Sequence, residues 1–258
     1  MGDIAAGAVL PDAGFLADAG VLADAGVLPD AGVLPGSGLL PGAGILPGQG
    51  VLPVLPALRE LLTSGGLPRG QVVTTDGWSL LSLALAAGAS AAGAWCAAVG
   101  LPALGVRAAI DIGVDPDRLL LVAEPGPGWA QVVASLLDGC DIVLLRPPDR
   151  PSAQLRRKLE AAARRHGCVL LVAGDWDGAA ARLRIADHQW TGIAPGHGRL
   201  RARRAHVLAE GRGAGARPRH AWIWLPSEDG TVTPADPAVA PRVTPSVTPR
   251  HTALTSAG

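Results

Sequence analysis

Residues that could handle a phosphate follow a short strand-like run at residues 71–75. A nucleotide-binding loop has the pattern G-x-x-x-x-G-K-[ST], with glycines for close backbone approach, a lysine for the phosphates and a hydroxyl for magnesium. The chain instead continues Asp76-Gly77-Trp78-Ser79-Leu80-Leu81-Ser82, which contains no lysine. Backbone amides at the start of the next helix would attract an anion only weakly by themselves. A structural turn that packs helix against sheet is therefore favoured over a working phosphate site.

The elements around this turn alternate between apolar runs and helical patterns, which predicts an α/β fold. Strands are expected at residues 71–75, 94–99, 118–123, 141–145 and 168–173. Helices are expected at residues 56–63, 78–92, 102–112, 129–139 and 152–167. Short apolar strands between helices indicate a mostly parallel sheet with helices on both faces. Further runs at residues 183–185, 199–209 and 221–225 predict an antiparallel C-terminal extension.

Several motifs in this region resemble a RecA-type recombinase core. They include the turn Gly65-Gly66-Leu67-Pro68-Arg69-Gly70 and the run Gly113-Val114-Asp115-Pro116-Asp117-Arg118-Leu119-Leu120. The resemblance implies a magnesium-binding aspartate at the end of the strand at residues 141–145, where Arg146 stands, and a water-activating glutamate within residues 99–105, which hold no acid. With the lysine also missing, we expect a degenerate P-loop, no cofactor and no enzymatic activity. A residual ATPase is the enzymatic alternative.

A RecA-like core with these losses resembles the ImuA-type accessory proteins of SOS mutagenesis, in particular their actinobacterial ImuA-prime branch. The similarity covers residues 54–227 and includes residues 93–102, 190–192 and 196–204. The resemblance implies a non-catalytic adaptor in a translesion-synthesis mutasome that binds an ImuB-like, polymerase-related protein. It also implies an indirect association with an error-prone replicative-type polymerase.

The chain divides by composition into three parts: a low-complexity tail at residues 1–53, the core at residues 54–226 and a Pro/Thr-rich tail at residues 227–258. In the first part glycine recurs every sixth residue, with leucine and proline in step. Such a period occurs in β-helices, but the regular prolines remove ladder donors and favour a flexible tail. The last part lacks periodic apolar residues, so we expect it to be disordered.

A basic stretch in the extension is the first candidate contact surface. It lies near the position of the single-stranded DNA loop in RecA, to which the core shows resemblance, and comprises Arg199, Arg201, Arg203 and Arg204, with Trp190 upstream. Arginines that neutralise phosphates and a tryptophan that stacks on a base would give salt-sensitive binding of single-stranded DNA. Arg199, Arg201 and Arg203 also alternate like one face of a strand, which suits an acidic protein partner or simple solvation. These interpretations stay open.

Two further candidate surfaces and one acidic motif complete the set. Trp222 and Trp224 lie on an expected strand and suit core packing or, as aromatics, a protein interface. Arg156 and Arg157 begin a basic face on the helix at residues 152–167. Asp175-Trp176-Asp177 follows a strand end, where two carboxylates could bind a metal or act as acid and base, but a solvated loop is favoured.

Composition restricts the remaining possibilities. The 258 residues include 22 acidic and 22 basic side chains, so net charge predicts no partner. Cys96, Cys140 and Cys168 are too widely spaced for a zinc or disulfide pattern, and we expect buried thiols. Residues 79–106 carry no charge and are long enough for a membrane span, but their glycines favour a buried helix, a strand and the start of a second helix. We expect a cytoplasmic protein without a membrane segment.

Overall fold

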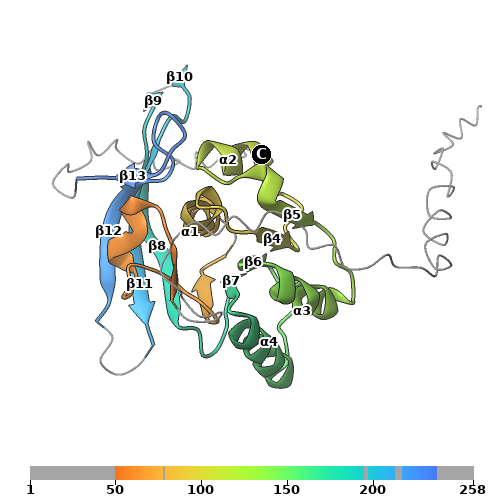
Figure 1. The fold of residues 1–258 in the computed structure, drawn as a ribbon. Helices are drawn as coiled ribbons and strands as arrows, with labels where there is room; N and C mark the ends of the chain where they lie inside the picture. The colour runs from red at the N-terminus through yellow and green to blue at the C-terminus, as the bar shows by residue number, and fades with distance from the viewer. Residues whose placement is uncertain (1–49, 78, 195–196, 213–216, 237–258) are drawn as a thin grey trace, which may run out of the picture. The chain divides into compact units, whose positions relative to one another are not determined.

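The computed structural model describes residues 50–77, 79–194, 197–212 and 217–236, and the statements below concern those residues. Nine strands there form one sheet in the order β13-β12-β11-β8-β3-β7-β6-β4-β5 (Figure 1). The parallel part consists of β3 (Val72–Thr75), β4 (Cys96–Val99), β5 (Leu119–Val122), β6 (Ile142–Leu145), β7 (Val169–Ala173) and β8 (Ala181–Trp190). The antiparallel extension consists of β11 (Arg203–Gly211), β12 (Arg219–Trp224) and β13 (Thr233–Pro234). The predicted mostly parallel sheet with an antiparallel extension is confirmed.

Helices cover both faces of the parallel strands, as predicted. On one face, α1 (Leu80–Ala91) and α2 (Val106–Asp111) pack on a core that includes Val73, Ala98 and Leu144. On the other, α3 (Trp129–Gly139) and α4 (Ala153–His166) pack on a core that includes Val72, Val99 and Leu145. Neighbouring residues of one strand thus enter different cores, because side chains alternate across a sheet. This double burial explains why the strands are apolar throughout.

The ends of α4 follow from local chemistry that is readable in the sequence. Ser152 caps the helix, and its Oγ accepts a hydrogen bond of 3.2 Å from the backbone N–H of Leu155. Gly167 ends it in the left-handed conformation, with a φ of 67° that favours glycine. In α3 the residues that point into the core are Trp129, Val133 and Leu137, as their spacing predicts.

Short elements connect the sheet and lengthen it at both ends. Two 3₁₀ helices, η3 (Pro56–Leu61) and η4 (Pro116–Arg118), precede β2 (Gly66–Pro68) and β5. The last unit of the six-residue repeat forms β1 (Val51–Pro53), which pairs with β2 and buries Leu52. At the other end β13 lies beyond residue 226, so sheet pairing extends past both edges of the predicted core. The rest of the tails, residues 1–49 and 237–258, lies outside the described residues.

The uncharged stretch at residues 79–106 folds as the globular interpretation predicts. Ser79 caps α1, β4 follows, and α2 begins at Val106. Across the described part of the chain, no helix combines the length and apolar character that crossing a membrane requires.

Close approach of α1 to the chain before η3 requires a glycine in the helix. A Cβ added at Gly88 would lie 2.6 Å from the backbone nitrogen of Leu55 and 2.6 Å from the Cα of Val54. These are backbone atoms, so they cannot rotate away. Gly88 therefore allows α1 to pack directly against the segment between β1 and η3.

Replacing Gly88 by Ala should lower the free energy of unfolding by about 1–3 kcal/mol, the usual cost of overpacking a core. The loss is expected although Ala favours a helix by about 1 kcal/mol over Gly. Gly139→Ala is the matched control, because Gly139 also lies in a helix but nothing is within 4 Å of its added Cβ. Urea denaturation of both variants tests this, and equal effects would contradict it.

Candidate interaction surfaces

The turn between β3 and α1 is closed by its own side chains. Thr75 and Ser82 are buried, and their hydroxyl oxygens lie 2.8 Å apart in a hydrogen bond. Thr75 Oγ1 also donates to the Gly77 carbonyl at 3.0 Å, while Ser79 Oγ accepts from the N–H of Leu81. Leu80 packs against the core, and Trp78 lies outside the described residues. The hydroxyls that a phosphate site would offer to magnesium are thus used inside the fold.

The RecA resemblance implies catalytic acids after β4 and β6. In the structure these two strand ends border a groove that is rich in proline. It has a volume of about 660 Å³ and is lined by Trp129, Arg146, Glu124, Asp149 and five prolines, Pro102, Pro125, Pro127, Pro147 and Pro148. Gly100 lies against the Arg146 carbonyl so closely that a Cβ there would collide with it. Arg146 brings a positive charge to the position expected for a metal-binding carboxylate. With Arg146, Glu124 and Asp149 in its wall, the groove carries charges of both signs.

The two carboxylates of the Asp-Trp-Asp motif point to different arginines. Asp175 pairs with Arg182 at 3.0 Å, and Asp177 pairs with Arg156 at 2.8 Å. Trp176 between them is buried, and its Nε1 donates to Glu160 at 2.8 Å. No group of three or more His, Cys, Asp or Glu side chains in the described residues is arranged to hold a metal. The motif therefore anchors the end of β7 to α4 and β8.

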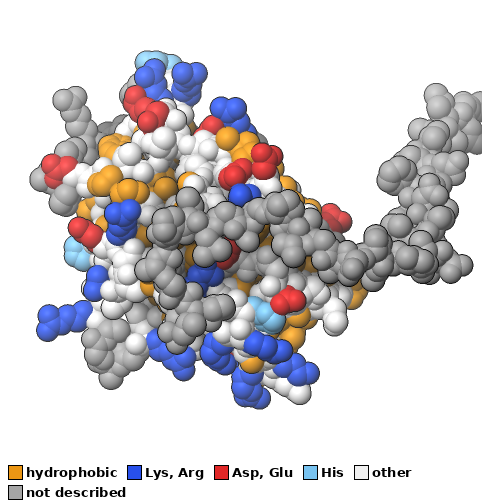
Figure 2. Space-filling model, viewed as in Figure 1, with side chains coloured by type: hydrophobic (Ala, Val, Ile, Leu, Met, Phe, Trp, Pro, Cys, Tyr) orange, Lys and Arg blue, Asp and Glu red, His pale blue; other side chains and the backbone are white. Residues whose placement is uncertain are grey.

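The basic face of α4 divides into an anchored part and an exposed part. Arg156 is held by Asp177, and its side chain is only 15% exposed. Arg157 and Lys158 are exposed on the next positions of the helix. Figure 2 shows Lys and Arg side chains gathered along the lower edge of the molecule, where Figure 1 places α4. Of the two predicted arginines, Arg157 is the one available to a partner.

The basic stretch of the extension lies on a hairpin that leaves the sheet between β8 and β11. Its tip carries the short strands β9 (Ile193–Ala194) and β10 (His197–Gly198). Strand β11 begins at Arg203 rather than at residue 199, so the predicted strand starts four residues too early. Arg199 and Arg201 instead lie in the returning arm of the hairpin, where their N–H groups bond to the Gly192 and Thr191 carbonyls.

Side chains on this hairpin combine charge with apolar surface. Arg199, Arg201 and Leu200 are exposed, Leu200 by 51%. At the hairpin base Trp190 is 40% exposed, and the guanidinium of Arg203 lies 5.5 Å from its ring centroid. A hydrogen bond of 2.8 Å from Arg203 Nε to the Leu225 carbonyl also holds that arginine in place. Aromatic and arginine side chains in this combination are typical of protein interfaces.

The fourth arginine of the stretch is structural. Arg204 is only 4% exposed, and its guanidinium lies 4.1 Å from the ring centroid of Trp222, which also stacks on His206 at 4.6 Å. Its Nη2 donates to the Asp236 carbonyl at 2.5 Å, which holds the end of the described chain against β12. Trp222 and Trp224 are half-buried in the same strand. A desolvated cation–π contact of this kind stabilises by about 2 kcal/mol, so this cluster serves packing.

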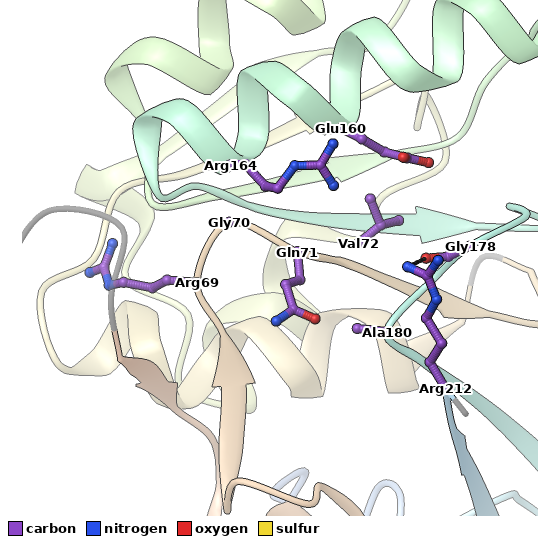
Figure 3. A pocket seen from close by; sticks show the side chains of 9 residues that line it. All are labelled: Arg69, Gly70, Gln71, Val72, Glu160, Arg164, Gly178, Ala180 and Arg212. Carbon is purple, nitrogen blue, oxygen red and sulfur yellow. Dashed lines mark hydrogen bonds between the residues drawn. The ribbon is translucent and has the colours of Figure 1, made fainter. Parts of the chain in front are cut away.

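A pocket with three arginines is the feature that sequence reasoning missed (Figure 3). It has a volume of about 480 Å³ and opens at the amino-terminal ends of β3 and β8. Arg69 in its wall is turned away toward Asp141, and Arg212 donates to the Gly178 carbonyl at 3.1 Å. Arg164 extends over the pocket from α4 without an ion pair to any described residue. The arginines come from residues far apart in the sequence, so no local motif could reveal them.

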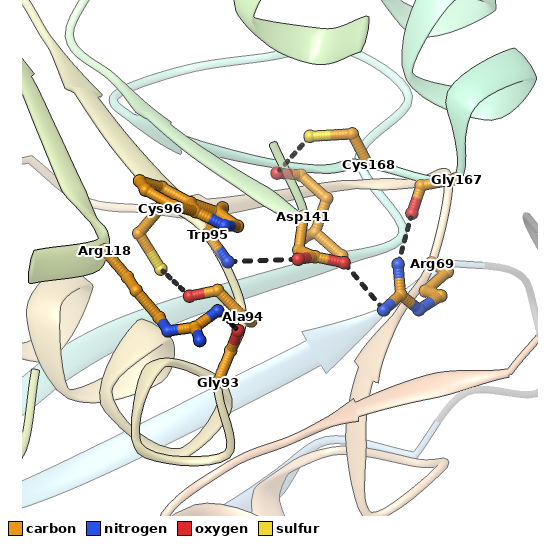
Figure 4. A network of polar contacts seen from close by, with 10 residues as sticks. Arg69, Gly93, Ala94, Trp95, Cys96, Arg118, Asp141, Gly167 and Cys168 are labelled. Atoms are coloured by element: carbon orange, nitrogen blue, oxygen red, sulfur yellow. Dashed lines mark hydrogen bonds and ion pairs between the residues drawn. The ribbon is translucent and has the colours of Figure 1, made fainter. Parts of the chain in front are cut away.

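A network around Asp141 joins the starts of several strands (Figure 4). Its Oδ1 pairs with Arg69 at 2.8 Å, and its Oδ2 accepts the backbone N–H of Trp95 at 3.0 Å. Arg69 also donates to the Gly167 carbonyl at 3.4 Å. One carboxylate thus links the segments that lead into β3, β4, β6 and β7.

The three cysteines lie at the same edge as buried, unpaired thiols, as their position before apolar strands predicts. Burial, together with a smaller effect of the neighbouring Asp141 carboxylate, raises the pKa of Cys96 to about 12. Burial likewise raises the pKa of Cys140 and Cys168 above the usual value. Thiols of this kind are poor nucleophiles and metal ligands at neutral pH.

The topology defines an α/β protein with a mostly parallel, helix-covered sheet, in which the turn from β3 to α1 is closed by the hydroxyls of Thr75 and Ser82. Comparison with known proteins identifies its family. The chain is 38% identical to the uncharacterized protein Rv3395c of Mycobacterium tuberculosis over 155 residues, which are 57% of this chain and 76% of that protein. It belongs to the same family, and residues 60–178 match the family described as the MT3502 N-terminal domain. That match ends before β8, so the hairpin lies outside it.

Among solved structures, the chain is similar to the flagellar accessory protein FlaH from Methanocaldococcus jannaschii. The TM-score is 0.48 and the sequence identity 11%, over 70% of this chain and 97% of that one.

Replacing Asp141 by Asn should lower the free energy of unfolding by about 1–2 kcal/mol. Arg69 loses a charged partner, and hydrogen bonds to charged groups contribute about 1.5–3 kcal/mol before a discount for the partial exposure of this pair. Asp111→Asn is the control, because it breaks an exposed i,i+4 pair with Arg107 and should cost less than about 0.5 kcal/mol. Similar losses in the two variants during urea denaturation would refute the linking role of Asp141.

Proposed function

We propose that this protein is a non-catalytic adaptor of a translesion-synthesis mutasome, in which it binds an ImuB-like, polymerase-related protein. The observation that carries the proposal is the closed turn between β3 and α1, where Thr75 and Ser82 bond to each other in the place of a phosphate loop. Arg146 at the end of β6 adds a second obstacle, because it brings positive charge where magnesium chemistry needs a carboxylate. A RecA-like fold that lacks a phosphate loop and a metal-binding carboxylate would act through contacts made by its surface.

The resemblance to ImuA-type proteins supplies the kind of partner. The described residues of the hairpin, 190–194 and 197–203, form the contact surface we favour, because they combine exposed arginines with the apolar side chains of Leu200 and Trp190. Arg157 on α4 is a secondary candidate. The error-prone replicative-type polymerase would then join the assembly through the ImuB-like protein, without its own contact to this chain.

A second candidate function, binding of single-stranded DNA, has a specific observation in its favour. Arg164 in the three-arginine pocket has no ion-pair partner among the described residues, and exposed Arg157 and Lys158 continue the positive charge along α4. Phosphate oxygens could bind there without any sequence readout. Against it, many neighbouring arginines, such as Arg156 and Arg182, are already neutralised by aspartates.

The adaptor proposal predicts that Arg199→Glu combined with Arg201→Glu weakens binding to the ImuB-like protein at least about tenfold, a loss of about 1.4 kcal/mol. Reversing two exposed charges removes their attraction to the partner while leaving the core untouched. Calorimetry with the purified partner measures the affinity, with and without ATP and magnesium, which should make no difference.

Arg107→Glu combined with Arg150→Glu is the matched control, since both side chains are exposed and belong to segments other than the hairpin. No complex with a well-folded partner, or equal loss in both double variants, would count against the hairpin. Heat from magnesium-dependent ATP binding to this chain alone would count against the non-catalytic assignment.

The DNA alternative predicts affinity for single-stranded oligonucleotides that falls steeply with salt. Arg164→Ala combined with Arg212→Ala should reduce the slope of log K against log salt by about 0.7 for each phosphate that the variant no longer neutralises. Fluorescence anisotropy between about 50 and 200 mM salt measures that slope. An unchanged slope, equal to that of Arg107→Ala, would exclude the pocket as a phosphate site.

A further inference from the structure

The two edges of the large sheet differ in how they are covered. At one end β12 is covered in part by β13, a two-residue strand that contains Pro234. At the other end β5 pairs with β4 alone among the described strands (Figure 1). Proteins usually protect a sheet edge with charge, proline or a covering segment. The sequence of β5, Leu119-Leu120-Leu121-Val122, carries no charge and no proline.

Large apolar side chains are exposed around this edge. Leu120 is 41% exposed and Leu121 is 50% exposed, and they lie on opposite faces of the sheet because they are neighbours in one strand. On α2, which precedes β5, Val106 and Ile110 are about one helical turn apart and are also exposed. Figure 2 shows hydrophobic side chains at the surface over the position of α2. A strand placed against β5 would therefore meet apolar surface on both of its faces.

Backbone pairing fixes which groups of β5 face outward. The Val122 carbonyl accepts the N–H of Gly100, which follows β4, so Val122 directs its backbone groups toward β4. Because these directions alternate along a strand, Leu121 directs its N–H and C=O to the open edge. The N–H of Leu119 is used by the η4 turn, where it bonds to Pro116, but its carbonyl also points outward. The edge thus offers donors and acceptors centred on Leu121.

We infer that β5 pairs antiparallel with β5 of a second copy of this chain, about a twofold axis at Leu121. In this register Leu121 lies opposite itself, Leu120 opposite Val122 of the other copy, and Leu119 opposite Ala123. Every side chain of the strand meets an apolar one, so the pairing buries no polar side chain. The two strands would join the two sheets into one.

Charge at the strand ends suits the same register. Arg118 directly precedes β5 and Glu124 follows it by two residues, so antiparallel pairing places the arginine of each copy near the glutamate of the other. Arg118 uses one N–H for the Gly93 carbonyl at 2.7 Å, and it approaches Asp115 at 3.7 Å, which leaves other donors for Glu124. Parallel pairing would instead place like charges together.

The extent of the apolar surface limits the strength of this contact. Four-residue strands alone bury less than the roughly 1,200 Å² of a standard interface, so the exposed residues of α2 must add to it. We therefore expect a dimer that dissociates in the micromolar range. A strand from a different protein would have to supply complementary apolar and charged side chains of its own. A contact between two copies needs only the surface that this chain already has.

A cysteine introduced at the twofold axis tests this inference in the full chain. Opposite residues of a hydrogen-bonded antiparallel pair have Cα atoms about 5.5 Å apart, within the usual range for a disulfide. Leu121→Cys should therefore form a covalent dimer rapidly when oxidised dithiothreitol is added. Leu200→Cys is the control, since Leu200 is equally exposed but lies on the hairpin. The native cysteines are buried and give no background.

Sedimentation of the wild-type chain gives an independent measurement. A monomer–dimer equilibrium should be abolished by Leu121→Lys and kept by Leu200→Lys, with circular dichroism confirming that both variants fold. Equal cross-linking of the two cysteine variants, or a wild type that stays monomeric at about 100 μM, would overturn the inference. Loss of ImuB-like binding in Leu121→Lys together with a monomeric wild type would assign the edge to that partner instead.

Discussion

The close packing of α1 is the constraint on which the rest of this structure depends. At its start the Thr75–Ser82 hydrogen bond ties the helix directly to the end of β3. Near its end Gly88 admits the backbone of Val54 and Leu55. A phosphate loop needs several residues of backbone that curl away from the strand before the helix begins, whereas here only residues 76–79 separate the two elements. Both contacts hold α1 close to the strand and to the segment that precede it.

The arginines of this chain illustrate why basic sequence does not by itself indicate nucleic-acid binding. Arg156, Arg182 and Arg69 each pair with an aspartate, and Arg204 is buried against Trp222. Charges used in this way position β7, β8 and the last described residues. The exposed positive side chains on the hairpin and those on α4 form separate small groups. Such groups fit contacts with a protein as well as contacts with a phosphate backbone.

The sequence predicted the parallel sheet well because its strands are buried on both faces and therefore apolar throughout. Ser152 and Gly167 likewise marked the ends of α4, since caps act within one turn. The start of β11 was placed too early, because the alternation of Arg199, Arg201 and Arg203 continues through a hairpin arm that is paired but lies outside the strand. Long-range features gave no signal: the burial of Arg204, the links made by Asp141 and the pocket around Arg164 depend on segments that only the fold brings together.

The strand order separates the two surfaces to which we assign contacts. The hairpin arises between β8 and β11, and four strands lie between β8 and β5. With neighbouring strands about 4.8 Å apart, this places β5 roughly 24 Å from β8 across the sheet. A partner on the hairpin and a second copy on β5 would therefore not compete for the same residues. Because the sheet connecting them is packed on both faces, two copies of the chain joined at β5 would present two hairpins at a fixed spacing. Such an arrangement binds a partner with two matching sites more tightly than either hairpin alone.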